Sequence, residues 1–362
     1  MNEDITKETV VSKINNKYLK AFLLSLGATA LMGHAQTGKP IMTAAEAAMY
    51  QGADRQQRLL EGALKEGEVS VYDVYPALAK VLDAFSKKYG IKVKVWRSGS
   101  EGVLQRVITE AKGGHFDVDL VQNNSPENEA AYREKLLQEV KSPYFADLIP
   151  QALPAHHQWS GLTVDVWVAA YNTNKVKKED LPKTYQDLLN PKWKGLLGIE
   201  AYDQVWFGTL LQEMGEDKGL KLFGSIMDTN PMSLRKGHSL LTMLISSGEV
   251  PMALTVYSWI PEQLKKKGAP IENFPLEPLI AQTSTIAMLK KAPHPNAAVL
   301  LYDFLLSEGQ TLLQQDSFVP VSKKFPAPYG GLPMKFVDPA QAIDSEQKWT
   351  KSFEETITKR AK

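Results

Sequence analysis

The chain repeats a pattern in which a short apolar or alternating segment is followed by a segment with helical spacing. Between residues 67 and 136 this pattern occurs three times, with strands predicted at 68–72, 91–95 and 118–121. The first of the three helices is the clearest, because its apolar residues fall at positions 78, 81, 82, 85 and 89, before Gly90. Strands that alternate with helices in this way form a parallel, doubly wound α/β sheet.

A second α/β unit is predicted in the middle of the chain, with strands at 196–199 and 252–256 and helices at 205–214 and 240–246. Two further β-rich segments, 161–171 and 283–289, flank this unit. The first is too long to be buried in one small sheet, so we interpret both as segments that cross between two lobes. The remaining expected elements are an Ala-rich helix at 44–65, a helix at 297–306, a surface loop at 320–333 and a last helix from about Pro339.

Length and composition also favour two lobes. At 362 residues the chain is longer than a usual single domain, and 43% hydrophobic with 23% charged residues is ordinary for a globular protein. The predicted boundaries are a signal peptide over 1–35, a tether and helix over 36–66, lobe 1 over 67–165, lobe 2 over 166–276, and a return to lobe 1 with C-terminal helices over 277–362.

The first 35 residues have the pattern of a cleavable secretory signal peptide. Lys13, Lys17 and Lys20 precede the apolar run Ala21–Met32. Gly33-His34-Ala35 then places small residues at both specificity positions of a cleavage site. An ordinary buried helix is the alternative, and the run is too short for a permanent membrane anchor. The chain has no cysteine to which a lipid could be attached. We therefore expect a soluble protein of a Gram-negative periplasm.

Charge and motifs argue against several classes of function. A formal net charge of +1 and the lack of a long Lys/Arg block disfavour nucleic-acid binding. The sequence has no GxSxG, P-loop or HExxH motif, no cysteine nucleophile, and six histidines in no recognisable catalytic arrangement. We therefore expect a monomeric binding protein without a cofactor rather than an enzyme.

The segment Ser247–Trp259 is the most informative part of the sequence. It ends one helix, forms a strand, and brings Tyr257, Ser258 and Trp259 to the carboxyl end of that strand. In open α/β sheets, ligands bind at this edge. The segment therefore predicts a binding site that includes Tyr257 and Ser258.

In their order along the chain, several segments resemble the family 1 extracellular solute-binding proteins, the periplasmic receptors of ABC importers, and within them the ferric-binding branch. These segments are Asp54–Tyr72, Arg97–Arg106, Tyr171-Asn172-Thr173, Ser247–Trp259, Pro293–Ala298 and Phe304–Ser307. The resemblance implies a type II periplasmic binding fold, in which two α/β lobes joined by crossing hinge strands close over one ligand. It also implies an inner-membrane ABC permease as partner.

The strongest chemical signal in the first lobe is the loop that contains Ser98, Gly99 and Ser100. Small residues between a strand and a helix leave backbone N–H groups free, and such a helix terminus binds anions. Arg97 supplies charge if its side chain turns inward. The alternative is that Ser100 is the N-cap of the helix and Arg97 is solvated.

Two neighbouring loops are predicted to share the same edge of the lobe. Asp73 and Tyr75 follow the first strand, whereas Asn123 and Asn124 follow the third. Asp73 either holds a ligand ammonium or caps the next helix. The asparagines either donate and accept hydrogen bonds with a ligand or form a turn before Pro126.

The second lobe contributes residues after a strand and before a helix, namely Tyr202, Asp203, Trp206, Gly237, His238 and Ser239. Trp206 either stacks on a ligand or is a core residue, and Ser239 is a candidate ligand contact. The pair His156-His157 resembles a metal site less than a solvated turn, because adjacent side chains point apart and no carboxylate is near in the sequence.

The iron ligands of the ferric-binding branch are largely absent. That branch holds iron with two consecutive tyrosines before a tryptophan, a histidine after the first strand and a carboxylate after the third. Here Tyr257-Ser258-Trp259 keeps one tyrosine, and the two loops read Asp73-Val74-Tyr75-Pro76 and Gln122-Asn123-Asn124. Ferric iron prefers anionic oxygen ligands, so the sequence argues against direct binding of iron alone.

The predicted ligand is therefore a small organic anion or zwitterion, such as a carboxylate, a phosphonate or a phosphate ester. No metal ligand is predicted. Two alternatives stay open: a ferric receptor that uses Tyr257 with a synergistic anion, and a receptor that presents its ligand to a periplasmic sensor kinase.

Overall fold

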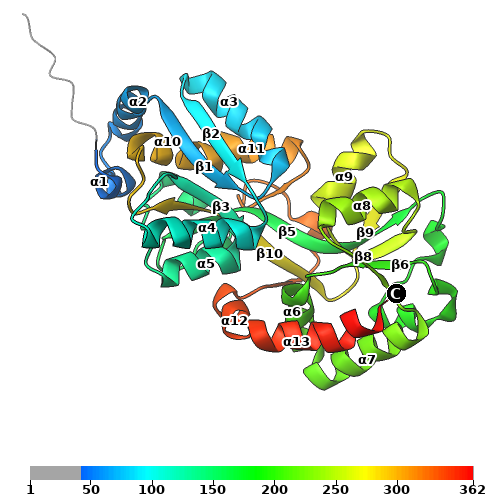
Figure 1. Cartoon of the computed structure of the whole chain (residues 1–362). Helices are drawn as coiled ribbons and strands as arrows, with labels where there is room; N and C mark the ends of the chain where they lie inside the picture. The colour runs from blue at the N-terminus through cyan, green and yellow to red at the C-terminus, as the bar shows by residue number, and fades with distance from the viewer. Residues whose placement is uncertain (1–41, 362) are drawn as a thin grey trace, which may run out of the picture. The chain divides into compact units, whose positions relative to one another are not determined.

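The computed structural model describes residues 42–361 (Figure 1). The predicted signal peptide over 1–35 and the start of the predicted tether lie outside the described residues. Among residues 42–361, no helix combines the length and the hydropathy that are needed to cross a membrane.

The first lobe is built on three parallel strands, as the repeating pattern predicts. β1 (Glu68–Asp73) lies between β2 (Lys92–Arg97) and β3 (Leu120–Asn124) and pairs with both. Gly67 and Gly90 end α2 and α3 with φ angles of 77° and 71°, which glycine adopts without strain. The helices are α1 (Ala44–Met49), α2 (Arg55–Glu66), α3 (Ala79–Tyr89), α4 (Ser100–Lys112), α5 (Ser125–Arg133), α10 (Pro295–Leu306) and α11 (Glu308–Gln315).

Two long strands connect the lobes. β5 (Trp159–Asn172) and β10 (Leu279–Leu289) pair with each other in antiparallel orientation, and every residue in both is buried. β10 also pairs with β3 of the first lobe, and β5 pairs with β8 of the second. The predicted crossing segments are therefore confirmed, and the main path of the sheet, β2-β1-β3-β10-β5-β8-β6-β7, runs from one lobe into the other.

The second lobe repeats the α/β arrangement. Its strands are β6 (Leu197–Glu200), β7 (Ser233–Arg235), β8 (Met252–Tyr257) and β9 (Ile271–Phe274), and its helices are α6 (Gln204–Met214), α7 (Glu216–Thr229), α8 (His238–Ser247) and α9 (Trp259–Lys266). β6 pairs in parallel with β7 and β8. In Figure 1, α8 and α9 lie on one side of these strands and α6 and α7 on the other. The short strands β4 (Leu137–Gln138), β11 (Val319–Pro320) and β12 (Met334–Phe336) extend the crossing pair.

Two predicted elements differ from the structure. The helix expected at 44–65 is broken into α1 and α2, because the carbonyl of Tyr50 accepts a hydrogen bond from Nη1 of Arg55 instead of continuing the helix. β3 continues through Asn123 and Asn124, which were expected in a loop, because both residues pair with β10. The strand therefore carries the two asparagines further along the sheet than the apolar pattern indicates.

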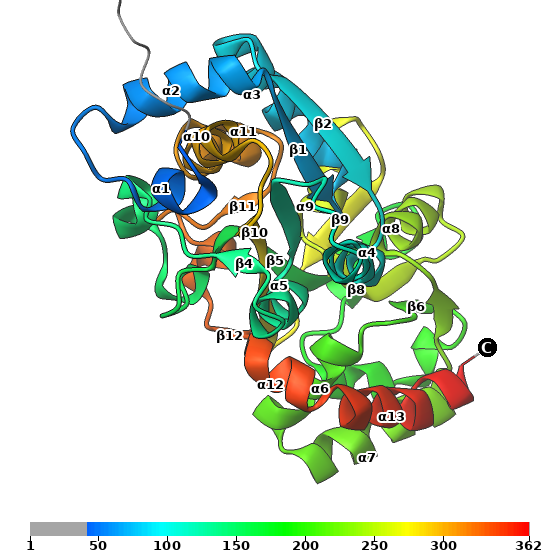
Figure 2. The same ribbon diagram turned by 60° about the vertical axis from the view of Figure 1, so that its left-hand side comes forward.

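The end of the chain packs on both lobes (Figure 2). α12 (Pro339–Asp344) lies against α5, where Nη1 of Arg133 is 2.6 Å from Oδ1 of Asp344. α13 (Glu346–Thr356) then packs on α6, where Trp349 covers Gly208 so closely that a Cβ at that glycine would lie 2.1 Å from the indole. The C-terminal segment is thus a third connection between the lobes.

Candidate functional site

The carboxyl ends of β1 and β2 are joined by an ion pair between buried Asp73 and partly exposed Arg97. Oδ2 of Asp73, a fully buried residue, accepts hydrogen bonds from Nε (3.2 Å) and Nη2 (3.1 Å) of Arg97, and Oδ1 accepts the backbone N–H of Tyr75 at 2.8 Å. Burial raises the pKa of Asp73 to about 6, although Tyr75 and Arg97 both act to lower it. Tyr75 is the N-cap of the short helix that starts at Pro76, so the predicted helix cap by Asp73 is wrong. Arg97 pairs with Asp73 while its side chain stays 36% exposed. Contact between Asp73 and a ligand ammonium stays a prediction.

Several predicted residues meet at the start of α4. Gly99 is the N-cap and makes no side-chain cap hydrogen bond, and Ser100 is the first helical residue, so the alternative of Ser100 as N-cap is wrong. Oγ of Ser100 accepts a hydrogen bond from Nδ2 of Asn124 at 2.9 Å, and its carbonyl accepts one from Nδ2 of Asn123 at 3.0 Å. The structure brings Ser98–Ser100 and both asparagines together. Their contact with a ligand stays a prediction.

Tyr75 joins the first lobe to a crossing strand. Its buried hydroxyl donates a hydrogen bond to Oδ2 of Asp165 in β5. Oδ1 of Asp165 accepts a hydrogen bond from Nε1 of Trp259, in the second lobe, at 3.1 Å, and the rings of Tyr75 and Trp259 are 5.6 Å apart. Burial raises the pKa of Asp165 to about 6. The sequence reading missed Asp165, whose only signal is an acidic residue inside the apolar segment 161–171.

Tyr257 ends β8 and is buried between the lobes' shared strands and α8. Its Oη accepts a hydrogen bond from Nε2 of Gln282 in β10 at 2.9 Å. Its ring lies 4.0 Å from the ring of His238 and 5.4 Å from that of Trp167. Burial, together with the charges of nearby carboxylates, Asp165 first among them, raises the pKa of Tyr257 well above its ordinary value. The phenol therefore stays protonated in this environment.

Three other predicted residues of the second lobe lie apart from one another. Trp206 is 1% exposed and packs against Tyr185 and Phe223, so the ligand-stacking prediction is wrong and the core alternative holds. Ser239 is exposed in the first turn of α8. Ser258 is buried at the start of α9, where its backbone N–H donates to the carbonyl of Val166 at 3.0 Å.

For the pair His156-His157, the prediction of a solvated turn is wrong in part. Nε2 of His156 lies 3.2 Å from Oε2 of Glu129, and its ring stacks on Tyr132 at 3.8 Å. A carboxylate that is distant in sequence therefore accompanies His156, contrary to the expectation of a solvated turn. His157 has a φ angle of 51° and does not join this pair.

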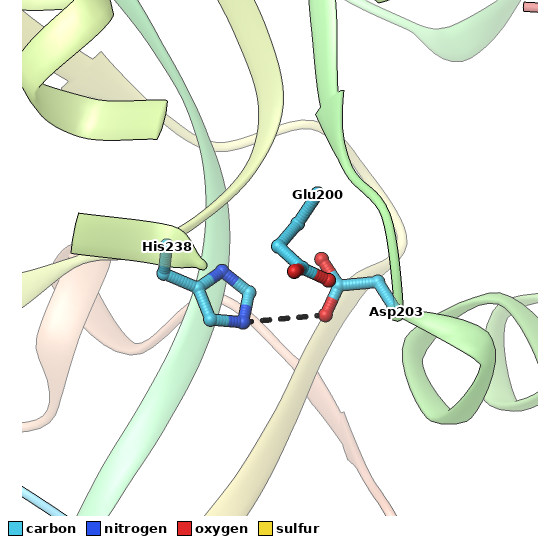
Figure 3. Close-up of side chains that lie close together, drawn as sticks. All are labelled: Glu200, Asp203 and His238. Carbon is cyan, nitrogen blue, oxygen red and sulfur yellow. Dashed lines mark ion pairs between the residues drawn. The ribbon is translucent and has the colours of Figure 1, made fainter. Parts of the chain in front are cut away.

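A cluster that sequence reading recognised only in part lies at the carboxyl end of β6 (Figure 3). Glu200, Asp203 and His238 each offer one ligand atom, and these atoms lie within 4.8 Å of one another. Nε2 of His238 is 3.4 Å from Oδ1 of Asp203. Burial alone would lower the pKa of His238, but Asp203 and Glu200 together raise it to about 9. Glu200 had no sequence signal beyond its position at the end of a strand.

A family model for bacterial extracellular solute-binding proteins matches residues 124–342, which is more than half of the chain. The chain belongs to this family. An Fe(3+)-binding periplasmic protein of Serratia marcescens is 30% identical over 183 residues, covering 50% of this chain and 53% of that protein. A periplasmic protein of Salmonella typhimurium, provisionally named for binding 2-aminoethylphosphonate, is 27% identical over 267 residues, covering 70% and 75%.

Solved structures of this kind of solute-binding protein share the fold. The periplasmic binding protein AfuA of Actinobacillus pleuropneumoniae, solved with fructose-6-phosphate, matches with a TM-score of 0.69 and 21% identity, covering 81% of this chain and 99% of that one. The predicted type II periplasmic binding fold is thereby confirmed. The three proteins are named for iron, named for a phosphonate and solved with a sugar phosphate, respectively, so membership of the family does not fix the ligand.

Proposed function

We propose that the chain is the periplasmic receptor of an ABC importer and that it captures a small organic anion or zwitterion between its lobes by lobe closure. The ligand classes are carboxylates, phosphonates and phosphate esters. The start of α4 in the first lobe would hold the anionic group, and Tyr257 would contact the ligand from the second. A relative provisionally named for a phosphonate supports these classes, and a structural neighbour was solved with a sugar phosphate.

The start of α4 is the observation that carries this proposal. Gly99 is exposed, it has no side chain to cap the helix, and no cap hydrogen bond is made there. The helix dipole and the uncapped N–H groups of the first turn both favour an anion. Ser98, Ser100 and Asn124 add neutral polar groups around the same turn, and the nearest guanidinium, that of Arg97, is already paired with Asp73.

Ferric iron is the second candidate ligand, because the Serratia relative is named for it and Tyr257 is retained. Against it, a ferric phenolate requires Tyr257 to lose its proton, whereas burial and the surrounding carboxylates raise its pKa. Iron would reveal itself by a tyrosinate-to-metal absorption band. Bound iron without that band would exclude Tyr257 as a ligand.

A thermal-shift screen of the purified protein tests the proposed ligand class. The panel contains carboxylates, phosphonates, phosphate esters, polyamines and ferric citrate. We expect an anion or zwitterion to raise the unfolding temperature in a saturable manner, since a ligand that binds only the folded state stabilises it by mass action. A response to polyamines alone, or to ferric citrate alone, would contradict the proposal.

Substitutions at the two sides of the site test the placement of the ligand. With the ligand from the screen, Ser100→Ala and Tyr257→Phe should each weaken binding about 5-fold, the worth of a neutral hydrogen bond. Asn124→Asp should weaken it at least about 10-fold, because a carboxylate beside Ser100 repels an anion. Calorimetric titration provides the affinities, and Ser225→Ala on the exposed face of α7 is the control. Unchanged affinity in all three variants would show that the ligand does not bind at this site.

The partner and the location belong to the same proposal. A permease and an ATPase encoded beside this chain would support an importer, whereas an adjacent histidine kinase would support the sensing role. We propose that the chain acts in the periplasm as a monomer, which size-exclusion chromatography with light scattering can test.

A further inference from the structure

The cluster of Glu200, Asp203 and His238 belongs entirely to the second lobe. Glu200 ends β6, Asp203 immediately precedes α6, and His238 is the first residue of α8. Figure 3 shows the two carboxylates next to each other, with the imidazole of His238 across from Asp203. None of the three belongs to the proposed anion site at the start of α4.

The carboxylate of Asp203 is the first indication that this cluster binds a cation. The residue is 4% exposed, and its Oδ1 accepts a hydrogen bond from Nε1 of Trp167 at 3.1 Å. Its Oδ2 is buried and has no hydrogen-bond partner among residues 42–361. A buried, unpartnered carboxylate oxygen is costly, so native proteins usually satisfy such an atom with a donor or a cation.

Glu200 is held in place by the backbone. Its Oε2 accepts the N–H of Tyr202 at 2.5 Å, and its Oε1 accepts the N–H of Gly237 at 2.8 Å. These two bonds fix the carboxylate beside that of Asp203 while leaving each oxygen a further lone pair. The carboxylates of Glu200 and Asp203 lie side by side, so they repel each other when both are ionised. A cation between them would offset that repulsion.

His238 presents the correct nitrogen to the cluster. Nδ1 lies 3.2 Å from the carbonyl of Thr255, which can only accept a hydrogen bond, so Nδ1 carries the proton. In neutral His238, Nε2 therefore faces Asp203 with its lone pair, in the arrangement that supporting carbonyls impose on metal-bound histidines. The ring of Tyr257, 4.0 Å away, packs on the imidazole and limits its rotation.

The separation of the facing atoms fits a bridging metal better than a direct charged hydrogen bond. A histidinium–carboxylate bond has a length of about 2.7–2.9 Å, whereas Nε2 and Oδ1 are 3.4 Å apart. With bonds of about 2.0–2.1 Å, two ligands of a tetrahedral zinc ion lie about 3.3–3.4 Å from each other. The alternative to a metal ion between the two atoms is a proton on Nε2 of His238.

We infer that Glu200, Asp203 and His238 form a site for a divalent transition metal such as Zn²⁺. One imidazole and two carboxylates suit a borderline divalent cation, and three protein ligands leave one position of a tetrahedral ion open. This site goes beyond the proposed function and does not depend on it, because its ligands are distinct from the residues that would hold the anion.

The test is a titration of the metal-free purified protein with Zn²⁺ in the absence of any organic ligand. We expect one ion per chain by elemental analysis after gel filtration. His238→Gln and Asp203→Asn should each weaken binding by at least the 10–100-fold that loss of a supporting residue causes. Ser225→Ala, on the exposed face of α7, is the control and should bind zinc as the unaltered chain does.

Substitution with Co²⁺ keeps the inference testable if a variant does not fold. In the unaltered chain, Co²⁺ should give the intense visible bands of a tetrahedral ion, and Zn²⁺ should displace them. No saturable uptake of either ion, or equal affinity in both cluster variants, would overturn the inference. Stabilisation by amines without uptake of metal would also overturn it, since the carboxylates would then bind an ammonium. These results are independent of the anion screen, so each proposal can fail by itself.

Discussion

Replacing Asp303 by alanine is expected to lower the free energy of unfolding by about 3–5 kcal/mol. Oδ2 of Asp303, in α10, lies 3.0 Å from both Nε and Nη2 of Arg55, and its Oδ1 accepts a hydrogen bond from Oγ of Ser142 at 2.7 Å. Arg55 is 8% exposed and Asp303 is 3% exposed. Alanine would leave the guanidinium buried without a counter-charge. Guanidinium denaturation of the variant and the unaltered chain measures the loss.

A surface ion pair provides the matched control for this prediction. Lys88 and Glu308 form an ion pair with side chains 41% and 57% exposed, so Glu308→Gln should change stability by less than about 1 kcal/mol. Combining Arg55→Met with Asp303→Leu should restore most of the loss, because an apolar pair of similar size carries no desolvation penalty. If Asp303→Ala lowers the free energy of unfolding no more than Glu308→Gln does, the ion pair of Arg55 and Asp303 does not stabilise the packing of α2 on α10.

As the pH rises from 3.5 to 6.5, the free energy of unfolding of the unaltered chain is expected to fall by about 3 kcal/mol relative to that of the Asp165→Asn variant. Burial raises the pKa of Asp165 from 3.8 to about 6, and one pH unit corresponds to about 1.4 kcal/mol. Because the folded-state pKa is the higher one, the protonated carboxyl stabilises the fold below about pH 4. That contribution is lost as the pH rises through about 6.

Asp187 provides a control of opposite sign. Backbone N–H groups of Thr184 and Lys183 lower the pKa of its carboxyl, so its contribution is present at neutral pH and is lost as the pH falls. Denaturation of Asp165→Asn, Asp187→Asn and the unaltered chain at several pH values measures both slopes. If the difference for Asp165→Asn does not vary with pH, the carboxyl between Tyr75 and Trp259 is not desolvated.

The fold could be predicted because burial imposes a pattern that is local in sequence. β5 is buried along its whole length, and the unusual length of its β-rich pattern identified the crossing segment. The break between α1 and α2 could not be predicted in the same way. At this break Arg55, the first residue of α2, binds Asp303, a partner 248 residues away in the chain.

The site was predictable only where a loop has special chemistry. Ser98, Gly99 and Ser100 were recognisable as a candidate anion site, because they are small residues at the junction of a strand and a helix. The prediction that Trp206 stacks on a ligand was wrong, because the sequence around a tryptophan after a strand is the same whether the residue lies in a core or in a ligand site. Asp165 and Glu200 were missed, since each is a single acidic residue whose partners come from other elements. The loss of a tyrosine at Ser258 was visible in the sequence, but the carboxylates that surround Tyr257 were not.

The third connection between the lobes restricts how they can move. β5 and β10 by themselves would allow one lobe to rotate freely about the pair, but α12 is attached to α5 through Arg133 and Asp344, and α13 is attached to α6 through Trp349. A change of angle must therefore also be absorbed near Ser345, between these two helices. The chain forms a closed linkage, so we expect the short joint at Ser345 to limit the angular range over which the lobes can open.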